Sequence, residues 1–387
     1  MDIRELDDQY IAKTYARFPI NLVSGKGAAL VDDQGKDYID LGSGIAVNIF
    51  GVADQIWINA VTAQLNRLQH TSNLYYTEPA VQLAEMLCKR TNMKKVFFSN
   101  SGAEANECAI KAARQWGENK KGLHHATIVT LTDSFHGRTL TTLAATGQDH
   151  YHHQYLPLTP GFVYAETNNA ADLESKVIAN QCCAIMIEVI QGEGGVKSLT
   201  PEFISAVARI ARENNLLVIV DEIQTGNGRT GKLYGYMNFD LQPDIVTTAK
   251  GLAGGLPLGA TLLGERVKDV FTPGSHGSTF GGNPVCCAGA LNVLSRIDDD
   301  LLRSVTEKSE WIIQQLKENS GVKSISGMGL MLGIDPVKPV AAVLKACAEK
   351  GVLVLSAKNK VRLLPPLTIE WDQLKKAIEI LGDCLSV

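Results

Sequence analysis

The sequence predicts an α/β fold in which a large domain with a mostly parallel sheet is followed by a smaller α/β domain. Between about residues 95 and 265, short apolar segments of strand type alternate with segments of helical type. The same alternation returns on a shorter scale between residues 327 and 387. Polar residues also follow two of the buried strands, at the place where open α/β sheets bind ligands.

The predicted elements follow from apolar runs of four to six residues and from longer amphipathic stretches between them. In the larger part the strands are 95–98, 127–131, 184–189, 216–220 and 245–248, with helices such as 201–214 between them. In the smaller part the strands are 330–334, 352–355 and 361–364, and the helices are 340–349 and 371–385. The predicted boundaries are an N-terminal segment, 1–50, a large domain, 51–285, and a small C-terminal domain, 286–387.

Composition is ordinary for a globular protein and excludes some classes of function. The 387 residues are 45% hydrophobic and 20% charged, which is enough for about two domains with sizeable cores. A net charge of −4 argues against nucleic-acid binding, and no apolar run approaches the roughly 20 residues that span a membrane. The acidic first residues are unlike a signal peptide. Eight cysteines without metal-type spacing indicate buried thiols in a reducing cytoplasm.

Lys250 is the first candidate for chemistry, because it follows the buried strand 245–248 and precedes a glycine-rich segment. Burial disfavours the ammonium ion and lowers the pKa of a lysine. An amine that is deprotonated near neutral pH can form a Schiff base with a carbonyl. The alternative is a solvated surface lysine, which is the commonest environment of this residue type.

Asp221 directly follows the strand 216–220 and is expected in the crevice beyond the carboxyl ends of the sheet. In isolation, a helix cap or a metal-binding acid explains such a residue equally well. Together with Lys250 it matches the requirements of pyridoxal 5'-phosphate. A lysine holds the aldehyde of this cofactor as an imine, and an aspartate keeps its pyridine nitrogen protonated.

Residues 99–106 (SNSGAEAN) predict the beginning of a helix, with a serine and a glutamate spaced as in a capping box. Gly102 and Ala103 leave backbone N–H groups bare at this N-terminus, which is a ready anion site. Alone, the pattern describes an ordinary capped helix. Beside the lysine and the aspartate it predicts a cradle for the phosphate group.

Six motifs in order make the chain resemble the class III (ornithine-type) aminotransferases, and within them the bacterial group that acts on acetylornithine. The similarity runs from about Tyr15 to the end of the chain. The motifs are 99–105 (SNSGAEA), 134–138 (SFHGR), 221–226 (DEIQTG), 249–251 (AKG), 278–284 (STFGGNP) and 362–367 (RLLPPL). So many specific blocks in the right order rarely arise by chance.

The resemblance implies fold type I of the pyridoxal-phosphate-dependent transferases, in which the N-terminal segment, 1–50, joins the small domain and the large domain, 51–285, binds the cofactor. It also assigns cofactor roles. Lys250 would carry the cofactor as an internal aldimine and then move the proton, and Asp221 would pair with the pyridinium nitrogen. Phe135 would stack on the cofactor ring. The other implied cofactor-binding residues are Gly102, Ala103, Glu222, Ile223, Gln224 and, from the second subunit of a homodimer, Thr279.

Two arginines and one glutamate are the implied substrate-binding groups, together with Ser278. Arg362 would bind the carboxylate next to the reacting carbon and Arg138 the distant one, because a guanidinium binds carboxylates in a two-pronged geometry. Acetylornithine has no carboxylate next to its reacting amine and would leave the charge of Arg362 without a carboxylate partner. Glu193, flanked by glycines, is the implied partner and would swing away when glutamate binds. Without the resemblance, a surface salt bridge explains each arginine equally well.

These roles imply a ping-pong enzyme that moves the terminal amino group of N2-acetyl-L-ornithine to 2-oxoglutarate, in arginine biosynthesis. Other donors stay open, namely ornithine, succinylornithine, succinyl-diaminopimelate and 4-aminobutyrate, although residues 44–48 (GIAVN) favour the acetylornithine type. A racemase or decarboxylase could use the same lysine and aspartate, and a non-catalytic module could keep the cofactor as a sensor. The two arginines and the glutamate favour two alternating substrates.

Three other segments are interpreted more plainly. Residues 226–232 (GNGRTGK) match the first seven positions of a P-loop, but Leu233 replaces the required hydroxyl residue, so nucleotide hydrolysis is not expected. The histidine-rich segment 149–153 predicts a solvated polar loop rather than a metal site. At 51–55 (GVADQ) the chain departs from the family pattern, in which Gly-His and then His-Pro are expected.

Overall fold

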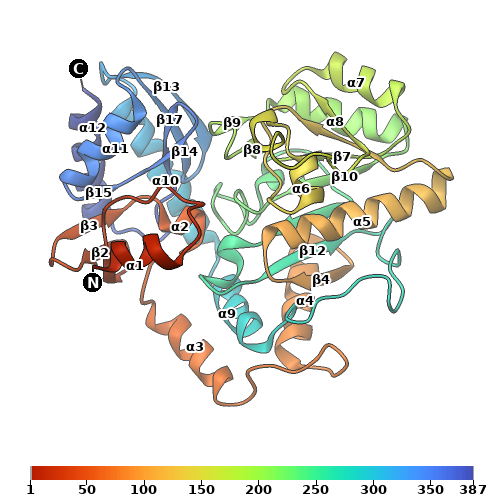
Figure 1. Ribbon diagram of the computed structural model, residues 1–387, viewed down its shortest axis with the longest axis horizontal. Helices are drawn as coiled ribbons and strands as arrows, with labels where there is room; N and C mark the ends of the chain where they lie inside the picture. The colour runs from red at the N-terminus through yellow and green to blue at the C-terminus, as the bar shows by residue number, and fades with distance from the viewer. Residues whose placement is uncertain (1, 387) are drawn as a thin grey trace.

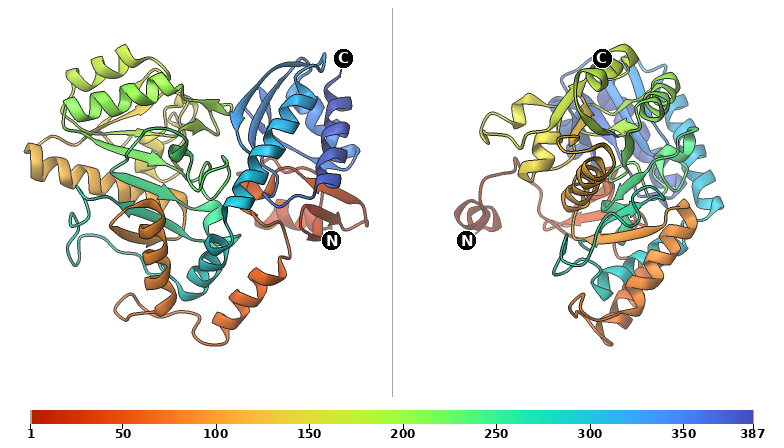
Figure 2. Two further views of the ribbon diagram at one scale, coloured as in Figure 1. Left: turned by 180° about the vertical axis from the view of Figure 1, so that it is seen from behind. Right: turned by 90° about the vertical axis from the view of Figure 1, so that its right-hand side faces the viewer.

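The computed structural model describes residues 2–386 and has the predicted α/β architecture, with mostly parallel strands in the principal sheet (Figure 1). A seven-stranded sheet with its covering helices forms the large domain. Two four-stranded sheets with their helices form the small domain, which lies beside the large domain in the left view of Figure 2. No helix within residues 2–386 is long and apolar enough to cross a membrane.

The seven-stranded sheet places the ends of its central strands at the site. In spatial order its strands are β4 (Lys95–Ser99), β12 (Gly259–Leu263), β11 (Ile245–Thr248), β10 (Leu217–Asp221), β7 (Cys182–Ile187), β5 (Thr127–Leu131) and β6 (Phe162–Ala165). Only β12 runs antiparallel to its neighbours among these strands, while β11, β10, β7, β5 and β6 pair in parallel. The carboxyl ends of β10 and β11 therefore lie side by side.

Helices cover both faces of this sheet, which is why its strands are continuous apolar runs. Alternate residues of β10 face opposite cores: Leu217 and Ile219 pack with the helix α5 (Gly102–Lys121), whereas Val218 and Val220 pack with α7 (Ala170–Ala179) and α8 (Pro201–Glu213). The remaining elements of the large domain are α3 (Gln55–Leu65), α4 (Glu78–Thr91), α6 (Leu140–Ala145), η1 (Asp149–Tyr151), β8 (Ile190–Gln191), β9 (Lys197–Ser198), η2 (Gly235–Asn238), η3 (Lys250–Ala253) and α9 (Pro284–Ser295).

The small domain combines both ends of the chain. One sheet has the order β1 (Leu22–Lys26), β2 (Ala29–Asp32), β3 (Asp37–Asp40) and β15 (Val352–Leu353). The other has the order β13 (Val322–Met328), β14 (Met331–Pro336), β17 (Lys360–Leu363) and β16 (Leu355–Ala357). The helices are α10 (Asp299–Leu316), α11 (Val340–Glu349) and α12 (Trp371–Leu385), and the short turn α2 (Ser43–Ala46) follows β3. The predicted domain boundaries at 50 and 285 stay a prediction.

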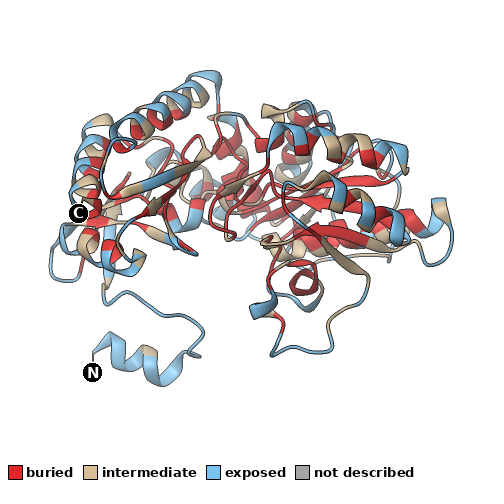
Figure 3. Cartoon of the chain, turned by 90° about the horizontal axis from the view of Figure 1, so that it is seen from above, coloured by how far each residue is buried: buried red, intermediate tan, exposed pale blue. Residues whose placement is uncertain are grey.

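Two features of the small domain differ from expectation or stand apart. The single strand expected at 352–355 is divided at Val354, because β15 pairs with β3 and β16 pairs with β17 in a different sheet. The N-terminal helix α1 (Ile3–Tyr10) buries none of its residues and stands away from the rest of the chain (Figure 3).

Candidate active site

Lys250 lies at the carboxyl end of β11 and begins η3 with a φ of +42°. A left-handed conformation costs a non-glycine residue about 1–2 kcal/mol, so neighbouring groups must hold it. Asn227 does so from inside the core: its Nδ2 donates to the carbonyl oxygen of Ala249 at 3.2 Å and to Oγ1 of Thr248 at 3.1 Å. The backbone that presents the lysine is therefore fixed on its N-terminal side.

The electrostatic surroundings of Lys250 favour its neutral amine. Burial lowers the pKa of Lys250 below its ordinary value of 10.5, because the ammonium loses hydration. Glu193 opposes this effect, Arg362 adds to it, and Asp221 is a further opposing charge nearby. The side chain as a whole is only partly buried, so the amine remains reachable. A neutral, reachable amine is the form that can attack a carbonyl.

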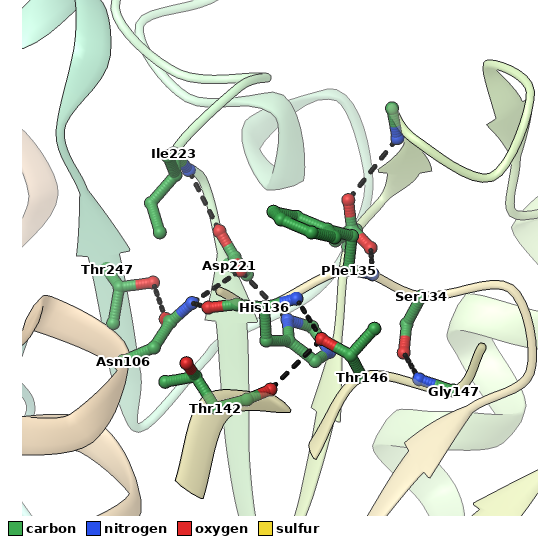
Figure 4. A network of polar contacts seen from close by, with 12 residues as sticks. Asn106, Ser134, Phe135, His136, Thr142, Thr146, Gly147, Asp221, Ile223 and Thr247 are labelled. Atoms are coloured by element: carbon green, nitrogen blue, oxygen red, sulfur yellow. Dashed lines mark hydrogen bonds and ion pairs between the residues drawn. The ribbon is translucent and has the colours of Figure 1, made fainter. Parts of the chain in front are cut away.

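Asp221 ends β10, and three donors orient its carboxylate (Figure 4). Its Oδ2 accepts from Nδ2 of Asn106 at 2.8 Å and lies 2.8 Å from Nδ1 of His136, while its Oδ1 accepts from the N–H of Ile223 at 3.1 Å. Oγ1 of Thr247 donates to Oδ1 of Asn106 at 2.7 Å, which fixes the orientation of that amide. The carboxylate is thus held in one direction before any ligand binds.

Beneath Asp221 lie two residues to which the sequence analysis gave no role. His136 is buried, and its Nε2 has no hydrogen-bond partner within the described chain, so the ring proton belongs on Nδ1 facing Asp221. Glu188 accepts from the N–H of Phe135 at 2.9 Å and from the N–H of Gly192 at 3.3 Å. Burial raises the pKa of Glu188 above its ordinary 4.5. Glu188 directly follows the buried strand β7, which is the same signal that identified Asp221 after its own strand.

Phe135 and Arg138 lie on the loop between β5 and α6. The Phe135 ring packs edge-on against Tyr151 at a centroid distance of 5.8 Å. The exposed guanidinium of Arg138 lies over both rings, at 4.3 Å from the Tyr151 centroid and 5.5 Å from that of Phe135. Cation–π contact holds Arg138 without neutralising it, so the guanidinium stays available to an anion. Tyr151 lies on η1 and was not singled out in the sequence.

The N-terminus of α5 has the geometry expected of the predicted anion site. The capping contact is present, since the N–H of Glu104 donates to Oγ of Ser101 at 3.2 Å. Gly102 and Ala103 are the first two residues of the helix, so their N–H groups have no intrahelical acceptor. A Cβ on Gly102 would lie 2.8 Å from Cδ1 of Ile223, so any larger residue would require the isoleucine side chain to shift. Because Ile223 also donates to Asp221, the anion site and the carboxylate are adjacent.

Arg362 reaches the site from β17 of the small domain and is 3% exposed. Its Nη1 donates to Oε1 of Glu193 at 2.5 Å and to Oε1 of Gln224 at 3.1 Å, and Nε2 of Gln224 donates to Glu193 at 3.4 Å. Burial alone raises the pKa of Glu193, but the charge and hydrogen bond of Arg362 outweigh it and hold the pKa below 4.5. Arg362, Glu193 and Gln224 were predicted from separate segments, and they form one hydrogen-bonded cluster.

Glu222 is turned into the protein. Its Oε2 accepts from Oγ1 of Thr225 and from the N–H of Gly235, both at 2.7 Å, and its Oε1 accepts from the N–H of Tyr236 at 2.7 Å. Burial raises the pKa of Glu222 to about 7. The carboxylate is fully engaged in fixing the loop after β10, and its predicted contact with a cofactor stays a prediction.

Ser278 and Thr279 lie on the loop before α9, beside the N-terminus of α5. Oγ of Ser278 accepts from Nδ2 of Asn100 at 3.2 Å, and Asn73 donates to the carbonyl oxygen of Ser278 at 3.0 Å. Thr279 is exposed on this chain. The loop is thus placed near the N-terminus of α5, and the side chain of Thr279 is open to solvent.

Residues 43–46 form a left-handed turn, with φ values of +43°, +65°, +65° and +61°. Oγ of Ser43 donates to the carbonyl oxygen of Leu364 at 2.5 Å, which ties the turn to the segment after β17. Ile49, three positions after this turn, packs on Gly251, where a Cβ would lie 2.4 Å from Cδ1 of the isoleucine. The stretch 44–48, which favoured one substrate type in the sequence, therefore borders the residue next to Lys250.

The segment that resembles a P-loop has a structural role. Arg229 is buried, and its Nη1 donates to the carbonyl oxygens of Leu330 at 3.1 Å and Pro365 at 2.5 Å, both in the small domain. Burial lowers the pKa of Arg229 to about 9. The arginine joins the two domains rather than binding a nucleotide.

Two other interpretations are refined by the structure. The expectation that 149–153 is a solvated loop is wrong for His152, which is 7% exposed and places Nε2 at 2.8 Å from the carbonyl oxygen of Thr146. No group of three or more His, Cys, Asp or Glu side chains in residues 2–386 is arranged to hold a metal ion.

In the divergent stretch 51–55, Asp54 caps α3 by accepting from the N–H of Trp57 at 2.8 Å, and it pairs with Arg296 at 2.7 Å.

The whole chain is similar to known proteins in sequence and in fold. The family Aminotransferase class-III matches residues 10–385. An acetylornithine aminotransferase of Haemophilus ducreyi is 48% identical over 386 residues, which cover 99% of this chain and 98% of that protein. The solved N-acetylornithine aminotransferase of Stenotrophomonas maltophilia has a TM-score of 0.85 at 33% identity, covering 98% of this chain and 97% of its own. The ornithine aminotransferase of Toxoplasma gondii has a TM-score of 0.95 at 29% identity, with coverage of 99% and 94%.

Proposed function

The chain belongs to the class III aminotransferases, and we propose that it moves the terminal amino group of N2-acetyl-L-ornithine to 2-oxoglutarate. The products are N-acetyl-L-glutamate 5-semialdehyde and L-glutamate, and the reaction is a step of arginine biosynthesis. The names of the similar proteins support this donor. The observation that carries the proposal is the contact of Glu193 with Arg362, because it neutralises the arginine when the amino donor has no neighbouring carboxylate.

The residues of the site fit pyridoxal 5'-phosphate, the cofactor of this family. When bound, this cofactor supplies an aldehyde and an electron-accepting ring. Lys250 offers an amine with a lowered pKa, and the N-terminus of α5 offers bare N–H groups in a cradle that a Cβ would fill. Asp221 offers a carboxylate that three donors already orient. We assign these residues, with Phe135 against the ring, to cofactor binding.

In the proposed mechanism, Lys250 moves the proton. Its neutral Nζ removes the proton from the substrate carbon that bears the nitrogen, and the same group later acts as an acid. Asp221 would keep the ring nitrogen of the bound cofactor protonated, and the contacts of Asn106 and His136 hold the carboxylate in one orientation for this role. The low exposure of Asp221 excludes water from this contact, which strengthens it.

Two arginines divide the carboxylates of the substrates. Arg362 would bind the carboxylate beside the reacting carbon of glutamate and 2-oxoglutarate after Glu193 leaves, while Gln224 stays as a second acceptor. Arg138, held over Tyr151, would bind the carboxylate that both donor and acceptor carry at their far end. One pocket thereby accepts a monocarboxylate and a dicarboxylate in turn.

We assign the chain to a homodimer whose second subunit contributes Thr279 to the anion site. Exposed apolar side chains support a second protein surface, since Leu74 is 87% and Tyr76 is 100% exposed, and α1 exposes Ile3 and Tyr10. All eight cysteines are free, which suits a reducing compartment, and we assign the enzyme to the cytoplasm.

A donor panel tests the proposed reaction. Purified protein loaded with the cofactor is incubated with acetylornithine, ornithine, succinylornithine, succinyl-diaminopimelate or 4-aminobutyrate, each with and without 2-oxoglutarate. Acetylornithine is expected to be the best donor by kcat/KM, with catalytic turnover only when the keto acid is present. A higher kcat/KM with another donor rejects the assigned substrate, and turnover without the keto acid rejects aminotransfer.

A further inference from the structure

The Glu193 loop, residues 192–195, contacts an ion pair that joins the two domains. The Nζ of Lys358 donates to Oδ1 of Asp133, and the Nζ of Lys197 lies 4.0 Å from Oδ2 of the same carboxylate. Asp133 precedes Phe135 by two positions in the large domain. Lys358 lies in the turn between β16 and β17 of the small domain. The pair thus connects the segments that flank the site on both sides.

Two glycines bring the Glu193 loop against both partners of this pair. A Cβ on Gly194 would lie 2.6 Å from the carbonyl oxygen of Asp133, so the loop approaches that residue as closely as glycine allows. A Cβ on Gly195 would lie 3.9 Å from Cβ of Lys358. Gly195 also has a φ of +95°, which other residues rarely adopt. A displacement of the loop therefore changes its packing against both charged residues.

Both ends of the loop are fixed by other contacts. At its beginning, the N–H of Gly192 donates to Oε2 of Glu188 at 3.3 Å. At its end, the carbonyl oxygen of Val196 accepts from Oγ of Ser326 at 2.7 Å. Val196 has a φ of +50°, which is strained for a β-branched residue and is therefore imposed by its surroundings. Because the ends are held, the freedom of Glu193 depends on the middle of the loop, where the ion pair lies.

We propose that Asp133 and Lys358 are positioning residues that keep Glu193 on Arg362 and so set the preference between monocarboxylate and dicarboxylate substrates. The inference rests on the proposed function, in which Glu193 leaves Arg362 when glutamate binds. The side chains of Lys358 and Asp133 are 38% and 37% exposed, so their pair is a modest restraint that salt weakens. A modest restraint suits a loop that has to move once in each half of the cycle.

Lys358→Met and Asp133→Asn test the positioning role, because each removes one charge and keeps the side-chain size. Glutarate, a dicarboxylate without an amine, is titrated calorimetrically into the cofactor-loaded enzyme, and the acetylornithine half-reaction is measured separately. In both variants the Kd of glutarate is expected to fall about threefold and the KM of acetylornithine to rise about threefold. The double variant should match Asp133→Asn alone, since that single change already removes the contacts of Asp133 with both Lys358 and Lys197.

Lys323→Met is the matched control, because Lys323 pairs with Asp335 at 3.7 Å between two strands of the small domain, without a partner in the large domain. It is expected to leave both quantities unchanged. Raising sodium chloride to roughly 0.5 M should lower the ratio of glutarate Kd to acetylornithine KM in the wild type more than in Lys358→Met. The positioning role is overturned if the glutarate Kd and the acetylornithine KM change by the same factor in the same direction, or if neither changes. If acetylornithine proves to be a poor donor while glutarate affinity still responds, the assigned donor fails and the positioning role stands.

Discussion

Nη1 of Arg362 lies 2.5 Å from Oε1 of Glu193, although the two residues belong to different domains. The guanidinium is almost fully buried, and its Nε has no hydrogen-bond partner within the described chain. Nη1 serves both Glu193 and Gln224 while Nε is idle, so the guanidinium does not yet bind any carboxylate in the two-pronged geometry. This geometry suits a site in which an internal carboxylate and a substrate carboxylate compete for the same cation.

Replacing Glu193 by glutamine should separate the two half-reactions. The neutral amide leaves the buried charge of Arg362 without an anion when acetylornithine binds, so kcat/KM for acetylornithine is expected to fall about tenfold. The half-reaction with glutamate should be unchanged or faster, because the internal competitor is gone. Stopped-flow measurement of each half-reaction checks this, with Glu265→Gln on the exposed Lys268 pair as control. Equal losses in both directions would contradict competition at Arg362.

Lys250→Ala should abolish turnover and leave the fold intact. The variant loses the group proposed to transfer the proton, so kcat is expected to fall by at least about 10³-fold. Its far-ultraviolet circular dichroism should match the wild type. Borohydride reduction followed by peptide mapping should label Lys250 in the wild type and nothing in the variant. A label on another lysine would refute the assignment, and the exposed Lys232→Ala serves as the control that keeps both activity and label.

Glu222 predicts a pH dependence of stability. Its pKa is raised from 4.5 to about 7 by burial, so the folded chain binds the proton more tightly than the unfolded chain. The stabilising contribution is complete below pH 4.5 and is lost as the pH rises through 7. Relative to Glu222→Gln, the unfolding free energy of the wild type should therefore fall by up to about 3 kcal/mol between pH 4.5 and 7.5. Urea unfolding of both proteins across this range checks the sign, and a wild type that gains stability over the variant as the pH rises would contradict it.

Arg229→Met should destabilise the junction between the domains. The change leaves the carbonyl oxygens of Leu330 and Pro365 without their donor and leaves the buried Asp40 without the cation that stabilises its charge. The expected loss is about 3–5 kcal/mol of unfolding free energy. Arg229→Lys keeps the charge but not the fork, and its thermal unfolding should fall between those of the wild type and Arg229→Met. A loss of activity without a loss of stability would instead indicate a role in the chemistry.

Much of the large domain could be predicted because its strands are buried on both faces and are therefore continuous apolar runs. The predicted strand at 245–248 coincides with β11, and that at 95–98 differs from β4 by one residue. The strands β12 and β13 were not predicted. The sequence of β12 contains glycine after a glycine-rich segment, and β13 carries lysine, serine and glycine on a partly exposed face. Neither pattern separates a strand from a loop without knowledge of the neighbouring strand.

Some residues of the site could be predicted from local sequence patterns, whereas others depend on contacts between distant segments. Lys250 and Asp221 could be found because each follows a buried strand, and the anion site because helix caps are local. The partners of Asp221 could not, since Asn106 comes from a helix 115 positions earlier and looks like any helical asparagine. The contact of Asp133 with Lys358 spans 225 positions and exists only because two domains meet. Charge pairs of this kind carry no periodicity that the sequence alone reveals.

His136 should act on the cofactor through Asp221. Removing its ring in His136→Ala deletes one of the three donors that orient the carboxylate, so the Kd of the cofactor is expected to rise about tenfold, with a similar loss in kcat. His136→Asn should recover part of both losses, because the asparagine Nδ2 can approach the position of the histidine Nδ1. His136→Ala should also move the pH at which the visible absorption of the bound cofactor changes, because Asp221 is assigned to the ring nitrogen, and His136→Asn should restore much of the wild-type profile.

A purely structural role for His136 would give a different pattern. The ring is buried, so its loss also leaves a cavity and lowers the melting temperature in either variant. If the asparagine variant were as inactive as the alanine variant, with an unchanged absorption profile, packing alone would explain the residue. Rescue of the absorption profile without rescue of the melting temperature is the outcome that separates orientation of Asp221 from support of the core, because only the hydrogen bond to Oδ2 is common to histidine and asparagine.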